Sequence, residues 1–409
     1  MLPASLCLSF FIGVVGQGSL KAIFAKLKAT RDTIYNIEEE KLHYARFEAD
    51  VKQATTIGDL SPEILESLFD ESRPALMQFI ADRINSKHAT WVASQDQPHF
   101  YGISHGDMML LHGSDERTLN NTDKSLINSI IVNGLPLAFD SREDFSACAG
   151  LIGHVSDQSN CNSCGAISVA GALGNRLCIK TNGKVRVQLS PAYAVACCVP
   201  SRGCTGVHGC LGANYVHIWE FTHSFGIPTG GDYTPVQSMT AASGCWPYNF
   251  PKCNHTPPNM RNHSVGKYPP CGSVPARKPP CQSSCPNRKY RTNLLVDLHF
   301  TVAPGGIRVT PNVGSIKSQI YAGGPVTAAI VFYDDLLYYN SGVYTHVYGA
   351  KVGYHLIKLI GWGMMGAQGY WLAVNSWNEE WGESGLLKIG FGGCEIEQYV
   401  MYGDPDVST

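Results

Sequence analysis

Two cysteines three residues apart, Cys161 and Cys164, stand in the stretch DQSNCNSCGAIS. Such a pair can be a redox dithiol, half of a zinc site, or a site where one thiol acts as a nucleophile. A zinc site needs a second C-x-x-C or a histidine pair at matching spacing, and Cys281 and Cys285 are four apart in a proline-rich stretch. We therefore favour a nucleophile over redox or metal chemistry, and we expect neither a metal nor an organic cofactor.

A thiol nucleophile needs a lowered pKa, a base, and donors for an oxyanion. Cys164 precedes the helical-looking run GAISVAGALGNRLCI, so it can lie at a helix N-terminus, where the helix dipole favours a thiolate. His355 stands in the strand-like run GYHLIKLIGWG, and Asn375 stands in NSW. An imidazole can hold the proton while an amide fixes the orientation of its ring. The three residues together predict acyl transfer through a thiol.

The composition sets the class of protein around these residues. The chain has 409 residues, of which 44% are hydrophobic, and this is enough for a substantial core. With 31 basic and 33 acidic residues, the net charge of −2 gives no overall attraction to nucleic acid or anionic membrane. We expect a globular protein whose partners are not polyanions.

The N-terminus and the cysteines indicate the secretory pathway. Residues 1–18 begin with an uncharged apolar run that is too short to span a bilayer comfortably, and we interpret them as a signal peptide, with a short buried helix as the alternative. Thirteen of the 15 cysteines lie between Cys148 and Cys285, a density typical of disulfides. Glycosylation sequons at Asn120, Asn254 and Asn262 fit the same compartment.

The texture of the chain changes near Leu135. Residues 19–134 are free of cysteine, charged and helical in pattern, with a helix start predicted at Ser61. Beyond the boundary, helices are predicted after Cys164 and after Cys210, and residues 245–285 form a Pro- and Cys-rich loop. Six runs rich in β-branched and aromatic residues are predicted strands: LLVDLHFTV, PVTAAIVFY, GVYTHV, YHLIKLIGWG, GYWLAVNSW and LLKIGF.

Several motifs in one order resemble the papain-like cysteine proteases, and within them cathepsin B. They are DQSNCNSC, CIKTNG, VACC, SGVYTHV, YHLIKLIGWG and YWLAVNSWNEEWG. The resemblance covers residues 135–409, and INSKHATWVASQDQPHFYGIS resembles the end of a cathepsin B prosegment. It implies an α+β fold of two lobes, a helical left lobe and a strand-rich, barrel-like right lobe, preceded by a helical propeptide over residues 19–134.

The same resemblance implies roles for single residues. Cys164 would be the nucleophile, His355 its general base and acid, and Asn375 the group that orients the imidazole. Gln158 would donate to the oxyanion, and Trp377 would shield the Asn375–His355 bond from water. It also implies six disulfides and leaves Cys164 and Cys394 unpaired. The pairs are Cys148–Cys178, Cys161–Cys210, Cys197–Cys281, Cys198–Cys204, Cys245–Cys285 and Cys253–Cys271.

The loop 245–285 resembles the occluding loop of cathepsin B, in which two adjacent histidines restrict cleavage to C-terminal dipeptides. Here His255 can pair with Asp157, but the next residue is Thr256, and a neutral hydroxyl is a weaker receptor for a carboxylate than an imidazolium. Carboxydipeptidase activity is therefore expected to be weakened unless His263 substitutes. A glycan on Asn254 would crowd the cleft.

Other departures from the pattern surround the cleft. The expected substrate-binding positions are Gly212, Ala213, Asn162, Tyr354, Leu356, Tyr399 and Trp377. Ala213 and Asn162 replace glycines, and Tyr399 stands where an acid would accept a basic side chain. Gly165 replaces a tryptophan after the nucleophile, and we expect Tyr354 and Leu356 to refill part of that volume. The changes favour smaller or apolar substrates.

The sequence thus predicts a thiol-dependent endopeptidase that hydrolyses peptide bonds through an acyl-thioester on Cys164. The alternative is a catalytically impaired pseudoprotease that acts as a binding or regulatory protein. The expected partners are peptide or protein substrates, the propeptide as inhibitor, and cystatin-like inhibitors. We expect a monomer without a membrane span, in a lysosome-like compartment or secreted.

Overall fold

The computed structural model describes most of the chain from residue 130 onward and parts of the region before it. The described residues are 17–30, 40–41, 43–45, 47–48, 51–52, 65, 68–70, 74–87, 90–108, 127–128, 130–255, 266–271, 276–303, 306–349 and 351–408. Four predicted features lie outside them: residues 1–16 of the predicted signal peptide, the helix start at Ser61, and the sequons at Asn120 and Asn262.

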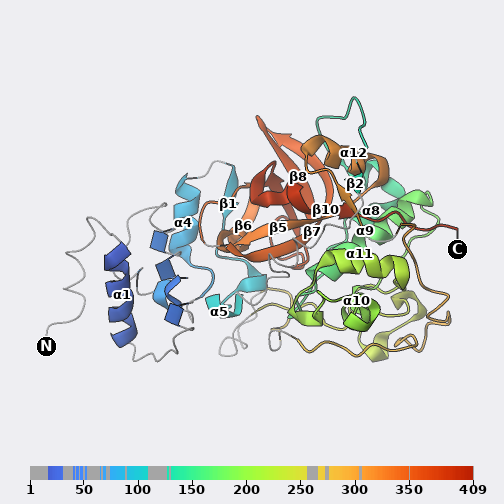
Figure 1. The fold of residues 1–409 in the computed structure, drawn as a ribbon, viewed down its shortest axis with the longest axis horizontal. Coiled ribbons are helices and arrows are strands. Elements are labelled where there is room, and N and C mark those ends of the chain that lie inside the picture. The colour runs from blue at the N-terminus through green and yellow to red at the C-terminus, as the bar shows by residue number, and fades with distance from the viewer. Residues whose placement is uncertain are drawn as a thin grey trace.

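Five of the six predicted strand runs meet in one mixed sheet (Figure 1). The longer strands are β5 (Val326–Tyr333), β6 (Tyr339–Tyr344), β7 (Lys351–Met365), β8 (Gln368–Val374) and β9 (Leu386–Gly390). The short strands are β1 (Trp91–Ala93), β2 (Ile127–Asn128), β3 (Phe139–Asp140), β4 (Ile307–Val309) and β10 (Val400–Tyr402). The order is β1-β6-β9-β8-β7-β5-β10-β4-β2, and β3 pairs with β7.

The centre of this sheet is the antiparallel pair β5 and β7. Seven consecutive residues of β5, from Val326 to Phe332, are buried, so the strand reads as one apolar run and not as an alternating pattern. Such a run is expected where both faces of a strand are covered. In the register, Ile330 of β5 faces His355 of β7, which places His355 on a rigid central strand.

The described strands form an open sheet and not the barrel-like lobe that the resemblance implied. Its end strands, β1 and β2, have three and two residues, and they lie at opposite ends of the strand order without pairing with each other. Short edge strands are a common way for a sheet to end without offering a template to another chain.

Helices form a second layer beside the sheet (Figure 1). They are α7 (Ser141–Asp144), α8 (Ala149–Ile152), α9 (Cys164–Lys180), α10 (Pro191–Cys197), α11 (Tyr215–Ser224) and α12 (Val313–Gly323). The predicted helices after Cys164 and Cys210 are α9 and α11. Helix α9 is buried on almost every side, as expected of a helix inside a large core. The Ser168 hydroxyl donates to the carbonyl of Ile357, 2.8 Å away, and joins α9 to β7.

One predicted strand, LLVDLHFTV at 294–302, is wrong. Its first part is a turn, because the Asn293 carbonyl accepts hydrogen bonds from Val296 and Asp297 and its side chain accepts one from Leu295. The Asp297 carboxylate then binds the backbone N–H and the hydroxyl of Thr229, at 2.8 and 2.7 Å. Capture of the backbone by asparagine and aspartate side chains overrides the β-propensity of the apolar residues.

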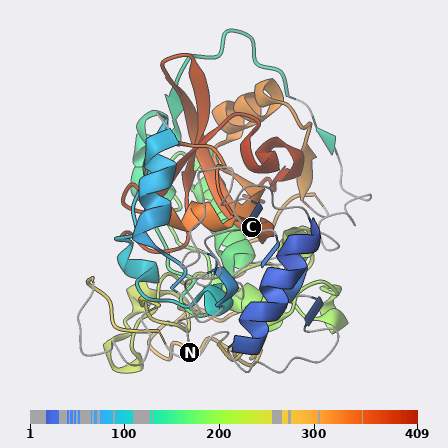
Figure 2. The ribbon, with the colours of Figure 1, turned by 90° about the vertical axis from the view of Figure 1, so that its left-hand side faces the viewer.

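The N-terminal segment lies against one side of both layers. It contains α1 (Gln17–Thr30), α4 (Gln78–Lys87) and α5 (His105–Met108), and Figure 2 shows α1 and α4 in front of the rest of the molecule. Strand β1 extends the sheet by pairing antiparallel with β6. Trp91 of β1 packs against Tyr344 of β6, with ring centroids 5.1 Å apart. In the part of the chain that the structure describes, no helix is both long and apolar enough to cross a membrane.

Candidate active site

Cys164 is the first residue of α9 and is fully buried with its thiol free. Two contacts fix its position: the Cys161–Cys210 disulfide just before the helix, and a 3.1 Å hydrogen bond from the Asn162 N–H to the Cys210 carbonyl. As the first helical residue, Cys164 has a backbone N–H without an intrahelical acceptor. The thiol therefore lies where a helix N-terminus presents donors.

The electrostatics of the thiol differ from the expectation of a lowered pKa. Burial raises the pKa of Cys164 to about 11, because desolvation outweighs the N–H groups of Leu356 and Gly165 that stabilise a thiolate. With the N-terminal segment in place, Cys164 is a neutral thiol.

His355 is held on β7 by Asn375 and Trp377. Its Nε2 is 2.7 Å from the side-chain oxygen of Asn375, and its ring stacks on Trp377 at a centroid distance of 4.5 Å. Because an amide oxygen only accepts, Nε2 carries the proton and Nδ1 is left as the acceptor of the neutral ring. Nδ1 has no hydrogen-bond partner among the described residues. Burial lowers the pKa of His355 to about 4, although the bond to Asn375 opposes this shift.

The structure brings the thiol and the imidazole segment together. A Cys164 thiolate would accept from the backbone N–H of Leu356, the residue after His355, and Cys164, Leu356 and Asn375 line one cavity. The unpaired Nδ1 of His355 therefore belongs to a strand segment whose next residue contacts the buried thiol.

Gln158 is fixed by Ser376, a residue whose role the sequence did not single out. The Gln158 N–H donates to the Ser376 carbonyl at 2.8 Å, and the Ser376 hydroxyl donates to the Gln158 side-chain oxygen at 2.9 Å. These bonds use the oxygen of the amide and leave its Nε2 buried without a partner among the described residues. A buried donor without an acceptor suits the binding of a transient oxyanion.

The wall expected to contact substrate is built around two tyrosines. The rings of Tyr354 and Tyr399 meet edge to face with centroids 5.8 Å apart, and the Tyr354 hydroxyl accepts from Lys351 at 3.0 Å. The same hydroxyl lies 3.4 Å from the carboxylate of Glu395, an acid that the sequence analysis missed. Gly212 adopts a φ of 106°, a conformation that favours glycine, and Ala213 and Asn162 are buried beside it.

The space beside Gly165 is closed by other residues than expected. A Cβ built on Gly165 would lie 3.5 Å from Ile218 and 3.8 Å from Ala213 and Tyr215, which belong to α11 and the turn before it. Tyr354 instead reaches toward Glu395. The atoms nearest to Gly165 therefore come from α11 and the turn before it, and partial filling of the larger volume by Tyr354 and Leu356 stays a prediction.

The loop 245–285 contains no helix or strand in its described residues, and His255 lies beside the N-terminal segment. His255 and Asp157 lie close enough for their charges to attract, but no hydrogen bond or close salt bridge joins the two side chains. The Asp157 carboxylate instead accepts from the N–H groups of Ser159 and Cys253, at 2.7 and 3.0 Å, and from the Asn378 side chain at 2.9 Å. Burial raises the pKa of Asp157 to about 6 against these bonds. Thr256 and His263 lie outside the described residues.

The sequon at Asn254 is incompatible with a glycan in this structure. Asn254 is fully buried, and its Nδ2, the atom that would carry the sugar, donates to the Glu380 carboxylate at 3.0 Å. A buried amide nitrogen with this bond has no room for a glycan.

The cysteines are joined in the pairs that the resemblance implied. The six disulfides are Cys148–Cys178, Cys161–Cys210, Cys197–Cys281, Cys198–Cys204, Cys245–Cys285 and Cys253–Cys271. Cys164 and Cys394 are free, and both are buried.

The N-terminal segment covers this site. Phe100 packs edge to face on Trp377 at 5.0 Å between centroids, and the carbonyl of His99 accepts from the N–H of His255 at 2.7 Å. Gln97 donates to the Tyr339 carbonyl at 3.0 Å. The described residues of this segment therefore cover Trp377, the residue whose ring stacks on His355.

Comparison with known proteins identifies the fold and the family. Residues 135–404 match the family described as papain family cysteine protease. The chain belongs to this family. It is 38% identical over 271 residues to a "Cathepsin B-like cysteine proteinase" of Schistosoma japonicum, covering 66% of this chain and 73% of the relative. It is 32% identical over 339 residues to "Cathepsin B-like cysteine proteinase 5" of Caenorhabditis elegans, covering 82% of this chain and 92% of the relative.

A solved papain-family proform supports the interpretation of the N-terminal segment. The structure resembles "proCathepsin B S9 from Trypanosoma congolense" with a TM-score of 0.63 and 26% identity, covering 82% of this chain and all of the other. The papain-like fold with a preceding helical prosegment is thereby confirmed. From here on we call the described residues before 135 the prosegment.

Proposed function

We propose that the chain is the latent form of a thiol-dependent endopeptidase in which Cys164 attacks the peptide carbonyl and His355 moves the proton. The observation that carries this proposal is the 2.7 Å bond between His355 Nε2 and Asn375, which leaves Nδ1 as a proton acceptor beside the thiol segment. The thiol proton passes to Nδ1, and the sulfur forms an acyl-thioester as the amine leaves with that proton.

The oxyanion of the tetrahedral intermediate would be bound by the Gln158 Nε2 and the Cys164 N–H. The first is a buried donor without a partner among the described residues, and the second is the first N–H of α9. Two preorganised donors in a desolvated site are a common way to stabilise acyl-transfer transition states.

Latency follows from burial of the reacting groups beneath the prosegment. Burial disfavours charge on both, since the pKa of the thiol is raised to about 11 and that of the imidazole is lowered to about 4. We infer that removal of the prosegment rehydrates the site and lets the thiolate–imidazolium pair form.

Cleavage within chains is favoured over removal of C-terminal dipeptides, because Thr256 follows His255 where a second imidazole would be needed. We further propose residence in a lysosome-like compartment or secretion, with peptide and protein substrates and cystatin-like inhibitors.

The test uses the processed protein and a thiol-directed peptidyl epoxide. Labelling of Cys164 that is lost in His355→Ala, together with cleavage of a peptide library with free and amidated C-termini, supports the endopeptidase. A processed protein that is neither labelled nor active from pH 4 to 8 supports the pseudoprotease alternative. Preferred release of dipeptides from free C-termini alone would overturn the assignment of cleavage mode.

A further inference from the structure

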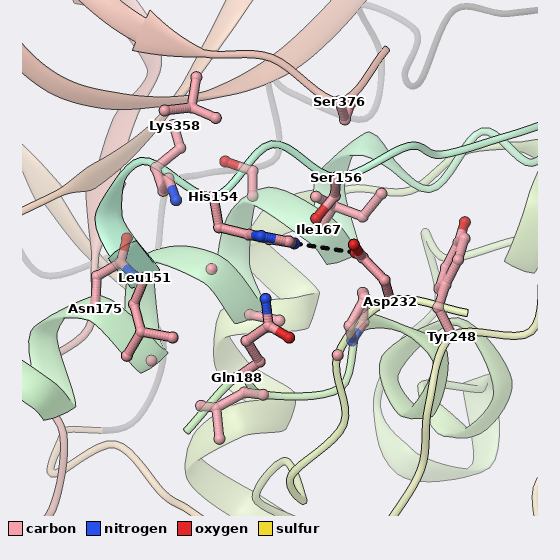
Figure 3. Close-up of a pocket in the computed structure, with 18 of the residues that line it drawn as sticks. Leu151, His154, Ser156, Ile167, Asn175, Gln188, Asp232, Tyr248, Lys358 and Ser376 are labelled. Carbon is pink, nitrogen blue, oxygen red and sulfur yellow. Dashed lines mark hydrogen bonds and ion pairs between the residues drawn. The ribbon is translucent and has the colours of Figure 1, made fainter. Parts of the chain in front are cut away.

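A cavity lies between α9 and the part of β7 that contains Leu356, Ile357 and Lys358. Its volume is about 60 Å³, enough for several water-sized groups. Its inner end is lined by Cys164, Asn375 and Ser376, and its mouth by His154 and Asp232. Figure 3 shows Ser376 and the His154–Asp232 ion pair, whose atoms are 3.0 Å apart.

Lys358 of β7 extends into this cavity with no acidic partner. Its side chain is 6% exposed, and no hydrogen bond or salt bridge joins its ammonium group to any of the described residues. The pKa of Lys358 is lowered to about 7, and burial is the only cause. Buried charges in proteins are ordinarily paired. The charged form of Lys358 therefore lacks the counterion that a buried ammonium group normally has.

The Lys358 side chain lies against a glycine of α9, and the cavity beside these two residues has the room for a counterion. The helix residue opposite it is Gly171, and a Cβ built there would be 3.6 Å from the Lys358 nitrogen. One turn further along α9, Asn175 is 3% exposed, and its side-chain oxygen has no partner among the described residues, so no bond from that oxygen holds the amide in place and the amide can turn its NH2 group toward an anion. Figure 3 shows Lys358 and Asn175 turned toward the same space above Gln188.

The other charged or titratable groups that line the cavity are already engaged or neutral. His154 and Asp232 pair with each other, and Asp157 accepts three hydrogen bonds. Cys164 and Tyr248 have pKa values raised by burial, so both are neutral below pH 8. No carboxylate of the described chain lies within salt-bridge distance of Lys358, and no neighbouring charge shifts its pKa.

We propose that this cavity binds a small monovalent anion, a halide or a carboxylate, against the Lys358 ammonium and the Asn175 amide. The anion would neutralise a charge that the fold otherwise buries alone, while the apolar walls of Leu151, Ile167 and Leu189 limit its size. The site goes beyond peptide hydrolysis and holds whether or not Cys164 is catalytic.

The experiment measures thermal unfolding of the full chain at pH 6.0, where Lys358 carries its charge. Sodium chloride and sodium acetate are titrated in turn against sodium gluconate at constant ionic strength, with Cys164→Ser in every protein to prevent processing. We expect saturable stabilisation of about 3 °C at ten times the dissociation constant. Chloride alone would identify a halide site, and acetate a carboxylate site.

Three variants decide the location. Lys358→Met should abolish the anion-dependent shift. Gly171→Glu should supply a tethered carboxylate, raising the melting temperature in gluconate and removing the response to added anion. Gly171→Ala is its matched control, because it gives the same gain in helix propensity and keeps the response.

If Lys358→Met does not fold, the comparison of Gly171→Glu with Gly171→Ala still shows whether the anion binds beside Lys358. A shift that is linear in concentration and equal in all variants, or no shift in the parent protein, would overturn the proposal.

Discussion

The imidazole of His99 in the prosegment lies edge-on against the imidazole of His255 in the loop 245–285, with ring centroids 5.1 Å apart. Phe100 stacks on His255 from the same side at 5.9 Å, and the Asn378 amide approaches His99 Nδ1 at 2.9 Å. Two histidines and an aromatic ring thus join the prosegment to the mature domain, and neither imidazole can take a proton without facing the other.

This pair makes prosegment binding sensitive to acid. Burial lowers the pKa of His99 and of His255 to about 3, and a charge on His99 further opposes protonation of His255. Released imidazoles titrate near 6.5, so the bound state is fully favoured above pH 6.5 and loses stability as pH falls from 6.5 toward 3. At pH 5.5 the loss is about 1.4 kcal/mol for each imidazole.

The variant His99→Phe tests this relationship because it keeps the ring and removes one proton site. We expect the midpoint pH of prosegment release, followed by tryptophan fluorescence or processing, to fall by roughly 0.5 unit or more. His208→Phe, at an exposed position, is the control. Asp157, whose pKa is raised to about 6, shifts the balance in the opposite sense but stays inside the mature domain. An unchanged midpoint in His99→Phe would refute the role of the pair.

Gln158 and Ser376 should contribute unequally to catalysis. Loss of an oxyanion donor in Gln158→Ala is expected to lower kcat by roughly 10²–10³-fold with little change in KM. Ser376→Ala removes only the hydroxyl that fixes the Gln158 oxygen, so we expect a fall of up to about tenfold. Steady-state kinetics of the processed enzyme on an amidated peptide measure both. Equal effects of the two variants would show that Gln158 does not bind the oxyanion.

Glu379 joins the loop to the strand-rich layer. Its carboxylate binds Lys252 at 2.9 Å, Lys267 at 3.0 Å and the Tyr268 hydroxyl. Burial acts to raise the pKa of Glu379, but these bonds outweigh it and lower the pKa to about 2. The stabilising effect is present above pH 4.5 and is lost between 4.5 and about 2, so the contact persists at mildly acidic pH.

Glu379→Gln should therefore loosen the loop at every pH above 4.5. We expect kcat/KM for long amidated peptides to rise about two- to fivefold, because a surface ion-pair network of this kind contributes on the order of 1 kcal/mol. Asp140→Asn, which breaks the 2.6 Å pair with Arg142 on the other side of the molecule, is the matched control. A similar rise in both variants would attribute the effect to general loss of stability.

Much of the site could be predicted from the sequence because its residues lie in contiguous motifs. Cys164 begins a helix whose apolar run is unbroken, and His355 stands in a strand with β-branched and aromatic neighbours, so local pattern placed both. The position of His99 against His255 could not be predicted, since 156 residues separate them and neither lies in an apolar period. The position of Lys358 could not be predicted either, because only the fold brings it opposite Gly171.

The strand prediction that was wrong covers a stretch in which side chains bind the backbone. The stretch 294–302 has strand composition, yet Asn293 and Asp297 hold it as a turn. The neighbours nearest to Gly165 were also not predicted, because α11, distant in sequence, approaches its Cβ position to 3.5 Å. Both outcomes depend on partners outside the local window from which propensity is judged.

The tyrosine pair at the expected specificity pocket predicts which substrates fit. Tyr354 and Tyr399 present apolar ring faces, and the only carboxylate near them, that of Glu395, lies 3.4 Å from the Tyr354 hydroxyl with Lys351 on the same oxygen. Glu395 shares the Tyr354 hydroxyl with Lys351 and is not free to bind a cationic substrate side chain, so we expect apolar residues to be preferred two positions before the cleaved bond. Tyr399→Glu should place a carboxylate in the pocket and raise kcat/KM for arginine relative to leucine at that position by roughly tenfold, in line with about 1–2 kcal/mol for a partly buried charge pair. Tyr399→Gln, of similar size but neutral, should leave the ratio unchanged. If Tyr399→Gln and Tyr399→Glu shift the preference equally, the pocket discriminates by volume and not by charge.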